Sequence, residues 1–105
     1  MATKDQAGLS MTVYISESAK SDLKEIEDAI VPLRRDAVIQ AILDHCETLA
    51  TMPHRYPLVP RYEVWGLRRC VYGHYLIFYR TRDESVEVIH IVHGSRDYDS
   101  MLFSP

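Results

Sequence analysis

The residues of this chain whose side chains could take part in catalysis or binding are mainly arginines, tyrosines and histidines in its second half. They are Arg68, Arg69, Tyr72, His74, Tyr75, Tyr79, Arg80, His90, His93 and Arg96. A histidine can take the proton of an RNA 2′-hydroxyl while an arginine stabilises the charge that develops on phosphorus. Arginine and aromatic side chains are also enriched at the anchoring positions of protein interfaces. These residue types therefore leave both a ribonuclease site and a protein-binding surface open.

A structural interpretation competes with both. Tyr75 and Tyr79 lie in the longest apolar run of the chain and would then be core residues, while His90 would be satisfied inside a strand. His93 and Arg96 stand apart, because they directly follow a predicted strand and so fall in a loop, where functional residues concentrate. They are the expected catalytic pair if the chain is a ribonuclease.

Several other chemistries find no support in the sequence. It has no nucleophile elbow, phosphate-binding loop or dinucleotide fingerprint, and no cysteine or histidine spacing typical of metal ligands. Cys46 and Cys70 are far apart, and we expect them to be reduced thiols packed as small apolar groups. No secretory signal and no apolar run of roughly 20 residues is present. We expect a cytoplasmic protein that needs neither a metal nor a cofactor.

Charge is unevenly distributed along the chain. Residues 53–82 hold six arginines against the single acidic residue Glu63, a balance of +5. The whole chain carries −3, so the remaining residues carry −8. An acidic helical half and an arginine-rich half suggest different partners for two faces. Trp65, the only tryptophan, ends a proline-rich stretch and fits a core anchor or an interface anchor equally well.

The hydrophobic pattern predicts an α+β domain built around residues 75–79. Five consecutive apolar or aromatic residues have the length of a strand, and the lack of polar alternation places that strand at the centre of a sheet. A first strand is expected at 11–15 and a helix at 17–31, with Ser16 or Ser18 as its N-cap. Pro32 interrupts this helix, and a second one runs from about residue 33 to 50.

The rest of the pattern completes the sheet. Three prolines make 53–64 an extended loop, and further strands are expected at 67–72 and 85–92. The last three strands should form an antiparallel meander that the first strand joins, and the helix hairpin should cover one face. The other face is left to solvent or a partner. Residues 1–10 lack periodicity, and we expect them to form a flexible leader that precedes a single domain spanning 11–105.

Four motifs in this order resemble the RelE/ParE superfamily of toxins from bacterial type II toxin–antitoxin modules. They are Gly66-Leu67-Arg68, Tyr75-Leu76-Ile77-Phe78-Tyr79-Arg80, Val86-Glu87-Val88-Ile89 and His93-Gly94-Ser95-Arg96-Asp97. The resemblance covers about residues 11–102 and is closest to the ParE branch.

Membership would imply a small toxin held inactive by a cognate, ParD-like antitoxin in a hetero-oligomer, through helix-in-groove and strand-type contacts. ParE-like members inhibit DNA gyrase without acting as nucleases, whereas RelE-like members cleave mRNA on the ribosome. RelE-type nucleases carry a basic residue in the central strand, where this chain has Leu76, and a C-terminal tyrosine, where it has Leu102 or Phe103. A missing charge-stabilising arginine costs on the order of 10²–10³ in rate.

The resemblance therefore favours gyrase inhibition, with no catalytic residues, over mRNA cleavage. A decayed homologue that binds its antitoxin without being toxic is the third possibility. A net charge of −3 also fits poorly with a ribonuclease that seeks the ribosome. We expect no membrane partner and no sequence-specific binding of nucleic acid.

Two sets of surface residues follow as expectations. The gyrase-binding set is Arg68, Arg69, His93, Arg96 and Asp97. The antitoxin-binding set is Trp65, Tyr75, Tyr79, Arg80 and Arg82. Charge reversal at Arg68 or Arg96 is expected to abolish toxicity without unfolding the chain.

Overall fold

A computed structural model describes residues 11–98 and residue 102, and it has the predicted α+β architecture. Its elements are β1 (Thr12–Ile15), α1 (Glu17–Asp28), α2 (Pro32–Thr48), two short 3₁₀ helices (Pro53–Arg55 and Glu63–Trp65), β2 (Arg68–Tyr72), β3 (Tyr75–Arg82) and β4 (Ser85–His93). The predicted leader and most of the tail beyond Tyr98 lie outside the described residues.

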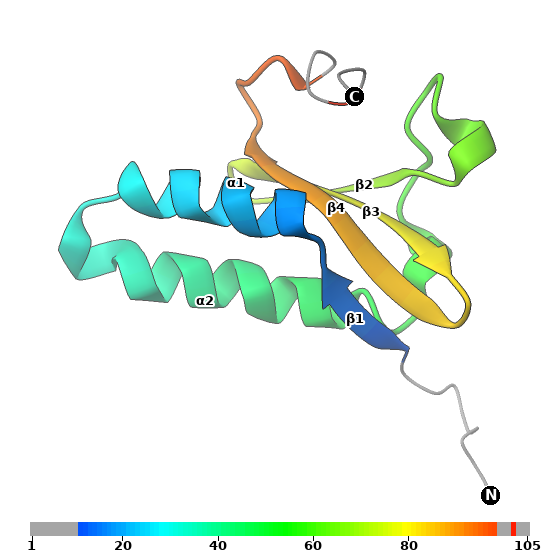
Figure 1. Ribbon diagram of the computed structural model, residues 1–105, viewed down its shortest axis with the longest axis horizontal. Helices are drawn as coiled ribbons and strands as arrows, with labels where there is room; N and C mark the ends of the chain where they lie inside the picture. The colour runs from blue at the N-terminus through cyan, green and yellow to red at the C-terminus, as the bar shows by residue number, and fades with distance from the viewer. Residues whose placement is uncertain (1–10, 99–101, 103–105) are drawn as a thin grey trace, which may run out of the picture.

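The strands form one sheet in the order β1-β4-β3-β2, so the 75–82 strand is internal, as predicted. β2, β3 and β4 form the antiparallel meander, while β1 runs parallel to β4. The two helices lie antiparallel to each other beside the sheet (Figure 1). Pro32 is the first residue of α2, a position at which the missing backbone N–H has no helical partner to lose. No helix among the described residues is long and apolar enough to cross a membrane.

Both faces of β3 are buried, each in a separate apolar cluster. Ile77 and Tyr79 pack with Ile42 of α2 and Val88 of β4 on the helix face. On the other face, Leu76 and Phe78 pack with Val59, Tyr62 and Leu67, and with the partly buried Tyr98 and Leu102. The expectation that this second face is left to solvent or a partner is therefore wrong over its centre. The proline-rich segment does not run as a free extended loop; it folds through two 3₁₀ turns and a bridge between Leu58 and Arg68.

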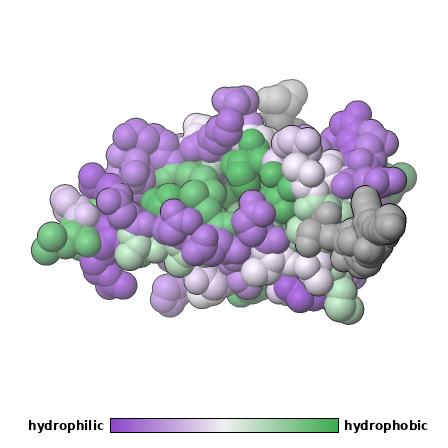
Figure 2. Space-filling view, turned by 90° about the horizontal axis from the view of Figure 1, so that it is seen from below, coloured by the Kyte–Doolittle hydropathy of each residue, from purple (hydrophilic) through white to green (hydrophobic). Residues whose placement is uncertain are grey.

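The surface on the side of α2 has an apolar area at its centre, bordered by hydrophilic side chains (Figure 2). α2 crosses this side of the molecule (Figure 1). At the end of the helix hairpin, Val31 and Leu33 are 62% and 98% exposed. Apolar groups exposed in this way are typical of surfaces that meet a partner.

Both cysteines are free and fully buried, as predicted. Burial raises the pKa of Cys46 to about 12 and also raises the pKa of Cys70. Because the thiolate is the reactive form, neither residue is a nucleophile at neutral pH. Their contribution is to fill the core on the helix face.

A β-bulge in β4 determines how α1 meets the sheet. Phe78 pairs with His90 but Tyr79 pairs with Val88, so Ile89 is an extra residue in β4. The carbonyl groups of Val88 and Ile89 consequently both point to the outer edge. The Ser16 backbone N–H donates to Val88 over 3.0 Å, and the Ser16 hydroxyl donates to Ile89 over 2.9 Å.

The same hydroxyl is the N-cap of α1, because Ser16 Oγ accepts from the Ala19 N–H at 3.0 Å. Of the two predicted caps, Ser16 is the one observed. The Ser16 side chain therefore caps the start of α1 and also donates to the Ile89 carbonyl at the bulge. These two bonds fix the point at which α1 leaves the sheet.

Ser16→Ala is expected to lower the free energy of unfolding by about 1–3 kcal/mol, since it removes the cap and leaves the Ile89 carbonyl without its donor. Ser18→Ala is the matched control: Ser18 is exposed in the first turn of α1, and its loss should change stability by less than about 0.5 kcal/mol. Urea unfolding followed by circular dichroism measures both. Equal stability of the two variants would contradict this role for Ser16.

Candidate functional site

A groove of about 390 Å³ lies between α1 and the C-terminal end of β4. Its walls include Ile26 of α1, Ile30 just after α1 and Ile91 of β4, and its polar groups include His93 and Arg96. A volume of this size lies within the range of pockets that hold small molecules or parts of a peptide. The groove therefore brings together the two residues that the sequence singled out after the last strand.

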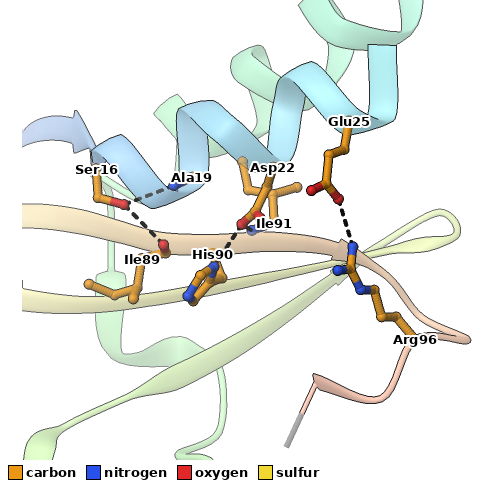
Figure 3. Close-up of polar contacts among 8 residues, drawn as sticks. All are labelled: Ser16, Ala19, Asp22, Glu25, Ile89, His90, Ile91 and Arg96. Atoms are coloured by element: carbon orange, nitrogen blue, oxygen red, sulfur yellow. Dashed lines mark hydrogen bonds and ion pairs between the residues drawn. The ribbon is translucent and has the colours of Figure 1, made fainter. Parts of the chain in front are cut away.

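Asp22 joins α1 to the edge of β4 at the inner end of the groove (Figure 3). Its carboxylate Oδ2 accepts from the Ile91 N–H at 3.0 Å and lies 2.8 Å from Nδ1 of His90. Asp22 is only 8% exposed, and such a buried carboxylate is stable only when it is hydrogen-bonded. His90 is thus satisfied within the structure, as the structural interpretation of its position expected.

Asp22 was not among the residues predicted from the sequence, because acidic residues of an amphipathic helix usually lie on its exposed face. A signal was present, since Asp22 follows Ala19 by three residues and precedes Ile26 by four. That spacing puts an acidic residue within the apolar stripe of α1, where an unpaired charge would be costly.

Arg96 reaches back from the turn after β4 to Glu25 of α1 (Figure 3). Its Nη1 donates to Glu25 Oε1 at 2.8 Å, and the carboxylate raises the pKa of the guanidinium further. The two side chains are 47% and 59% exposed, so the ion pair is screened by water and contributes at most about 1 kcal/mol. It spans the rim of the groove and can open at small cost.

His93 is exposed and makes local contacts. The Ser95 N–H donates to its Nδ1 over 3.2 Å, and Ser95 Oγ lies 2.8 Å from the same nitrogen. Its ring stacks on His74 with centroids 6.0 Å apart and meets the edge of Tyr75 at 5.8 Å. Because Nδ1 accepts a hydrogen bond, the neutral ring carries its proton on Nε2. In this arrangement Nε2 of His93 is available as a hydrogen-bond donor.

The two arginines of β2 lie on opposite faces of the sheet, since side chains alternate along a strand. Arg68 Nη1 donates to the carbonyls of Tyr56 at 2.6 Å and His54 at 3.2 Å, and so holds the proline-rich segment. Arg69 Nη1 instead bonds Tyr98 Oη at 3.0 Å. Arg69 is therefore tied to the segment after β4, close in sequence to Arg96 and Asp97, whereas Arg68 is not.

The residues expected to bind the antitoxin are also dispersed. Tyr75 is half-buried in the wall of the groove. Trp65 is 60% exposed, and with Arg80 it borders a second hollow of about 230 Å³ on the opposite face. Arg82 is exposed at the end of β3.

Tyr79 requires a correction. It is fully buried and its hydroxyl donates to the Pro53 carbonyl, so it is a core residue and cannot contact a partner directly. Burial also raises its pKa to about 12. Alternation within an unbroken apolar run does not reveal which aromatic ring is exposed, and this is why the sequence did not exclude it.

Comparison with known proteins agrees with this architecture. A family model described as the ParE toxin of the type II toxin–antitoxin system parDE matches residues 13–98. No curated protein sequence matches the chain. Among solved structures, the toxin–antitoxin complex RelBE2 from Mycobacterium tuberculosis superposes with a TM-score of 0.64 and 24% identity, covering 81% of this chain and 99% of that one. The chromosomal ParDE system of P. aeruginosa gives a TM-score of 0.65 and 20% identity, covering 79% and 95%.

The bonds of Arg68 change what its substitution should do. Arg68→Glu is expected to lower the free energy of unfolding by about 1–3 kcal/mol, because two carbonyl groups lose a charged donor and meet a carboxylate instead. Arg82→Glu makes the same charge change at an exposed position and should leave stability within about 0.5 kcal/mol. Thermal unfolding of both variants tests this. An Arg68→Glu protein as stable as the parent chain would restore Arg68 as a free surface residue.

Proposed function

Because this chain belongs to the ParE family of toxins from type II toxin–antitoxin systems, we propose that it inhibits DNA gyrase by direct binding and that a cognate, ParD-like antitoxin neutralises it. The observation that carries the gyrase assignment is the state of the groove. Its arginine is engaged by the Glu25 carboxylate, and Nδ1 of its histidine is engaged by Ser95. These groups suit the recognition of another protein better than cleavage of a phosphodiester.

Two further positions support a binding protein over a nuclease. Leu76, where the resemblance places the basic residue of the nucleases, is only 9% exposed in the apolar cluster of the second face. Leu102, near the expected C-terminal tyrosine, packs against the same cluster, while Phe103 lies outside the described residues. An apolar side chain at either position neither stabilises a phosphorane nor transfers a proton.

The proposed gyrase surface is the turn after β4 together with Arg69. Arg96 and His93 border the groove, Asp97 is exposed, and the Tyr98 hydroxyl links the turn to Arg69. Arg68 is removed from this set because its guanidinium is occupied by the carbonyls of Tyr56 and His54. Positively charged donors on a short, exposed turn provide specificity and a favourable encounter with an acidic partner.

The antitoxin is proposed as the second partner. The solved relatives RelBE2 and ParDE are described as toxin–antitoxin systems, which supports an antitoxin for this chain also. Tyr75, Trp65, Arg80 and Arg82 remain its proposed contacts, and the apolar area on the α2 side is a further surface that it would cover (Figure 2). An acidic segment would complement the +5 balance of residues 53–82.

The function is tested by adding purified, antitoxin-free toxin to a DNA gyrase supercoiling assay. The parent chain should block supercoiling, and Arg96→Glu should raise the concentration needed at least tenfold, since it reverses the charge of the proposed contact. Glu25→Gln is the matched control, because it removes the same ion pair but keeps Arg96. It should inhibit as well as the parent chain or better.

Other results would redirect the assignment. Full inhibition by Arg96→Glu would exclude Arg96 from the gyrase surface. Unaffected gyrase together with cleavage of ribosome-bound mRNA would establish the ribonuclease alternative, which the shared position of His93 and Arg96 in one groove favours. Inactivity in both assays would identify a homologue that binds its antitoxin without being toxic.

A further inference from the structure

The turn after β4 keeps its shape through bonds that do not involve the Arg96 side chain. The Gly94 N–H donates to the His74 carbonyl over 2.8 Å, and the Arg96 backbone N–H donates to the His93 carbonyl over 3.0 Å. Beyond the turn, the Tyr98 ring packs against the apolar cluster of the second face. The Arg96 guanidinium can therefore exchange its partner while the turn stays in place.

In the free toxin that guanidinium binds a carboxylate of the toxin itself. Nη1 of Arg96 donates to Oε1 of Glu25, and both side chains are about half exposed (Figure 3). A guanidinium presents its N–H donors in a planar fork, and two parallel bonds to one carboxylate are its strongest arrangement. The bond to Glu25 uses one nitrogen of this fork, so a carboxylate that approaches from solvent can make two bonds in place of one.

Of the two carboxylates that border the groove, Glu25 is the one that can be exchanged. Asp22 is buried, and its carboxylate is held by the Ile91 N–H and by His90. Releasing it would leave these groups unpaired in the interior, which is costly. Glu25 can instead turn into solvent, where water replaces the lost bond at small cost.

Beside the ion pair the groove is apolar. This part is lined by Ile26 near the end of α1, Ala29 and Ile30 just after it, and Ile91 of β4. The volume of about 390 Å³ leaves room for an apolar side chain of a partner. The groove thus combines an apolar surface with a cation at its rim, which suits an apolar residue that stands next to an aspartate or a glutamate.

We propose that DNA gyrase enters this groove with an apolar side chain next to a carboxylate, that the carboxylate takes the place of Glu25 on Arg96, and that Glu25 is an internal competitor that weakens the toxin. The inference rests on the proposed function for the identity of the partner. It adds the chemistry of the segment that gyrase contributes and an internal limit on the affinity. The argument for a carboxylate ligand is Glu25 itself, since its carboxylate is bound at 2.8 Å where the partner's would be.

Internal competition has a definite size. The partner forms its ion pair only after the pair between Glu25 and Arg96 has opened, so the affinity contains the difference between the two pairs. Opening an exposed ion pair reduces binding up to about fivefold. A toxin without the Glu25 charge should therefore bind the same ligand about two- to fivefold more tightly.

A short peptide tests the site without gyrase. The probe is acetyl-Leu-Asp-amide, which offers an apolar side chain beside a carboxylate, and acetyl-Leu-Asn-amide is its uncharged control. NMR titration follows the amides of Ile91 and His93, which line the groove. Glu25→Gln should lower the Kd of the aspartate peptide about two- to fivefold. Arg96→Gln should remove the preference for the aspartate peptide over the asparagine peptide, because the guanidinium is lost.

Glu17→Gln is the matched control variant. It removes the same charge from α1, but the Glu17 side chain is 92% exposed and pairs with Lys20. The peptide should bind this variant as it binds the parent chain, because general repulsion between acidic groups is not the cause of the effect. Equal affinities of the parent chain and Glu25→Gln, or an equal gain in Glu17→Gln, would overturn internal competition. Failure of the peptide to bind Glu25→Gln has the same meaning.

The supercoiling assay then tests gyrase as the occupant. Glu25→Gln should lower the toxin concentration that gives half inhibition about two- to fivefold. The same substitution in an Arg96→Gln background should have no effect, since no guanidinium is left to compete for. An unchanged concentration in the first case, or a gain that persists in the second, contradicts the proposal. If the parent chain leaves gyrase unaffected, gyrase is excluded together with the proposed function, and the peptide titration decides separately whether the groove takes a carboxylate.

Discussion

Ser16 bonds the backbone groups of Val88, Ile89 and Ala19 at the point where the chain leaves the sheet and starts its first helix. The placement of α1 along β4 depends on these bonds of Ser16. Because α1 begins against the bulge, its second turn delivers Asp22 to the next open N–H of β4, and its third turn delivers Glu25 to Arg96. The helix is thus positioned by polar groups along one strand edge, while the apolar cluster beneath it supplies most of the burial free energy.

The groove exists because this contact is incomplete. α1 follows β4 as far as Ile91 and then diverges, so the helix and the strand separate around a volume that apolar side chains line but do not fill. α1 forms one side of the groove and also contributes two polar residues that border it, Asp22 and Glu25. A binding site at this position therefore needs no separate loop or inserted segment, and its rigidity comes from two regular elements.

Much of the fold could be predicted from the sequence, because local patterns specify it. The apolar run of β3, the stripe of α1 and the proline at the start of α2 each indicate their element directly. What the proline-rich segment covers could not be predicted, since prolines constrain the backbone and not its packing partner. The bulge was equally hidden: even alternation from Val86 would place His90 on the helix face, whereas Ile91 is the residue found there. For the site, the position of His93 and Arg96 just after a strand was enough to predict that they are candidate functional residues. Nothing in the sequence indicated that Arg68 holds the proline-rich segment.

The bulge at Ile89 also has an evolutionary meaning. Because one extra residue exchanges the faces of everything that follows it in β4, deleting or inserting a single codon there would trade His93 and Ile91 for their neighbours in the groove. The β3–β4 turn and the pairing of Ser85–Val88 would be untouched. A change of one residue at the bulge would therefore exchange the β4 side chains that line the groove and leave the rest of the sheet in place.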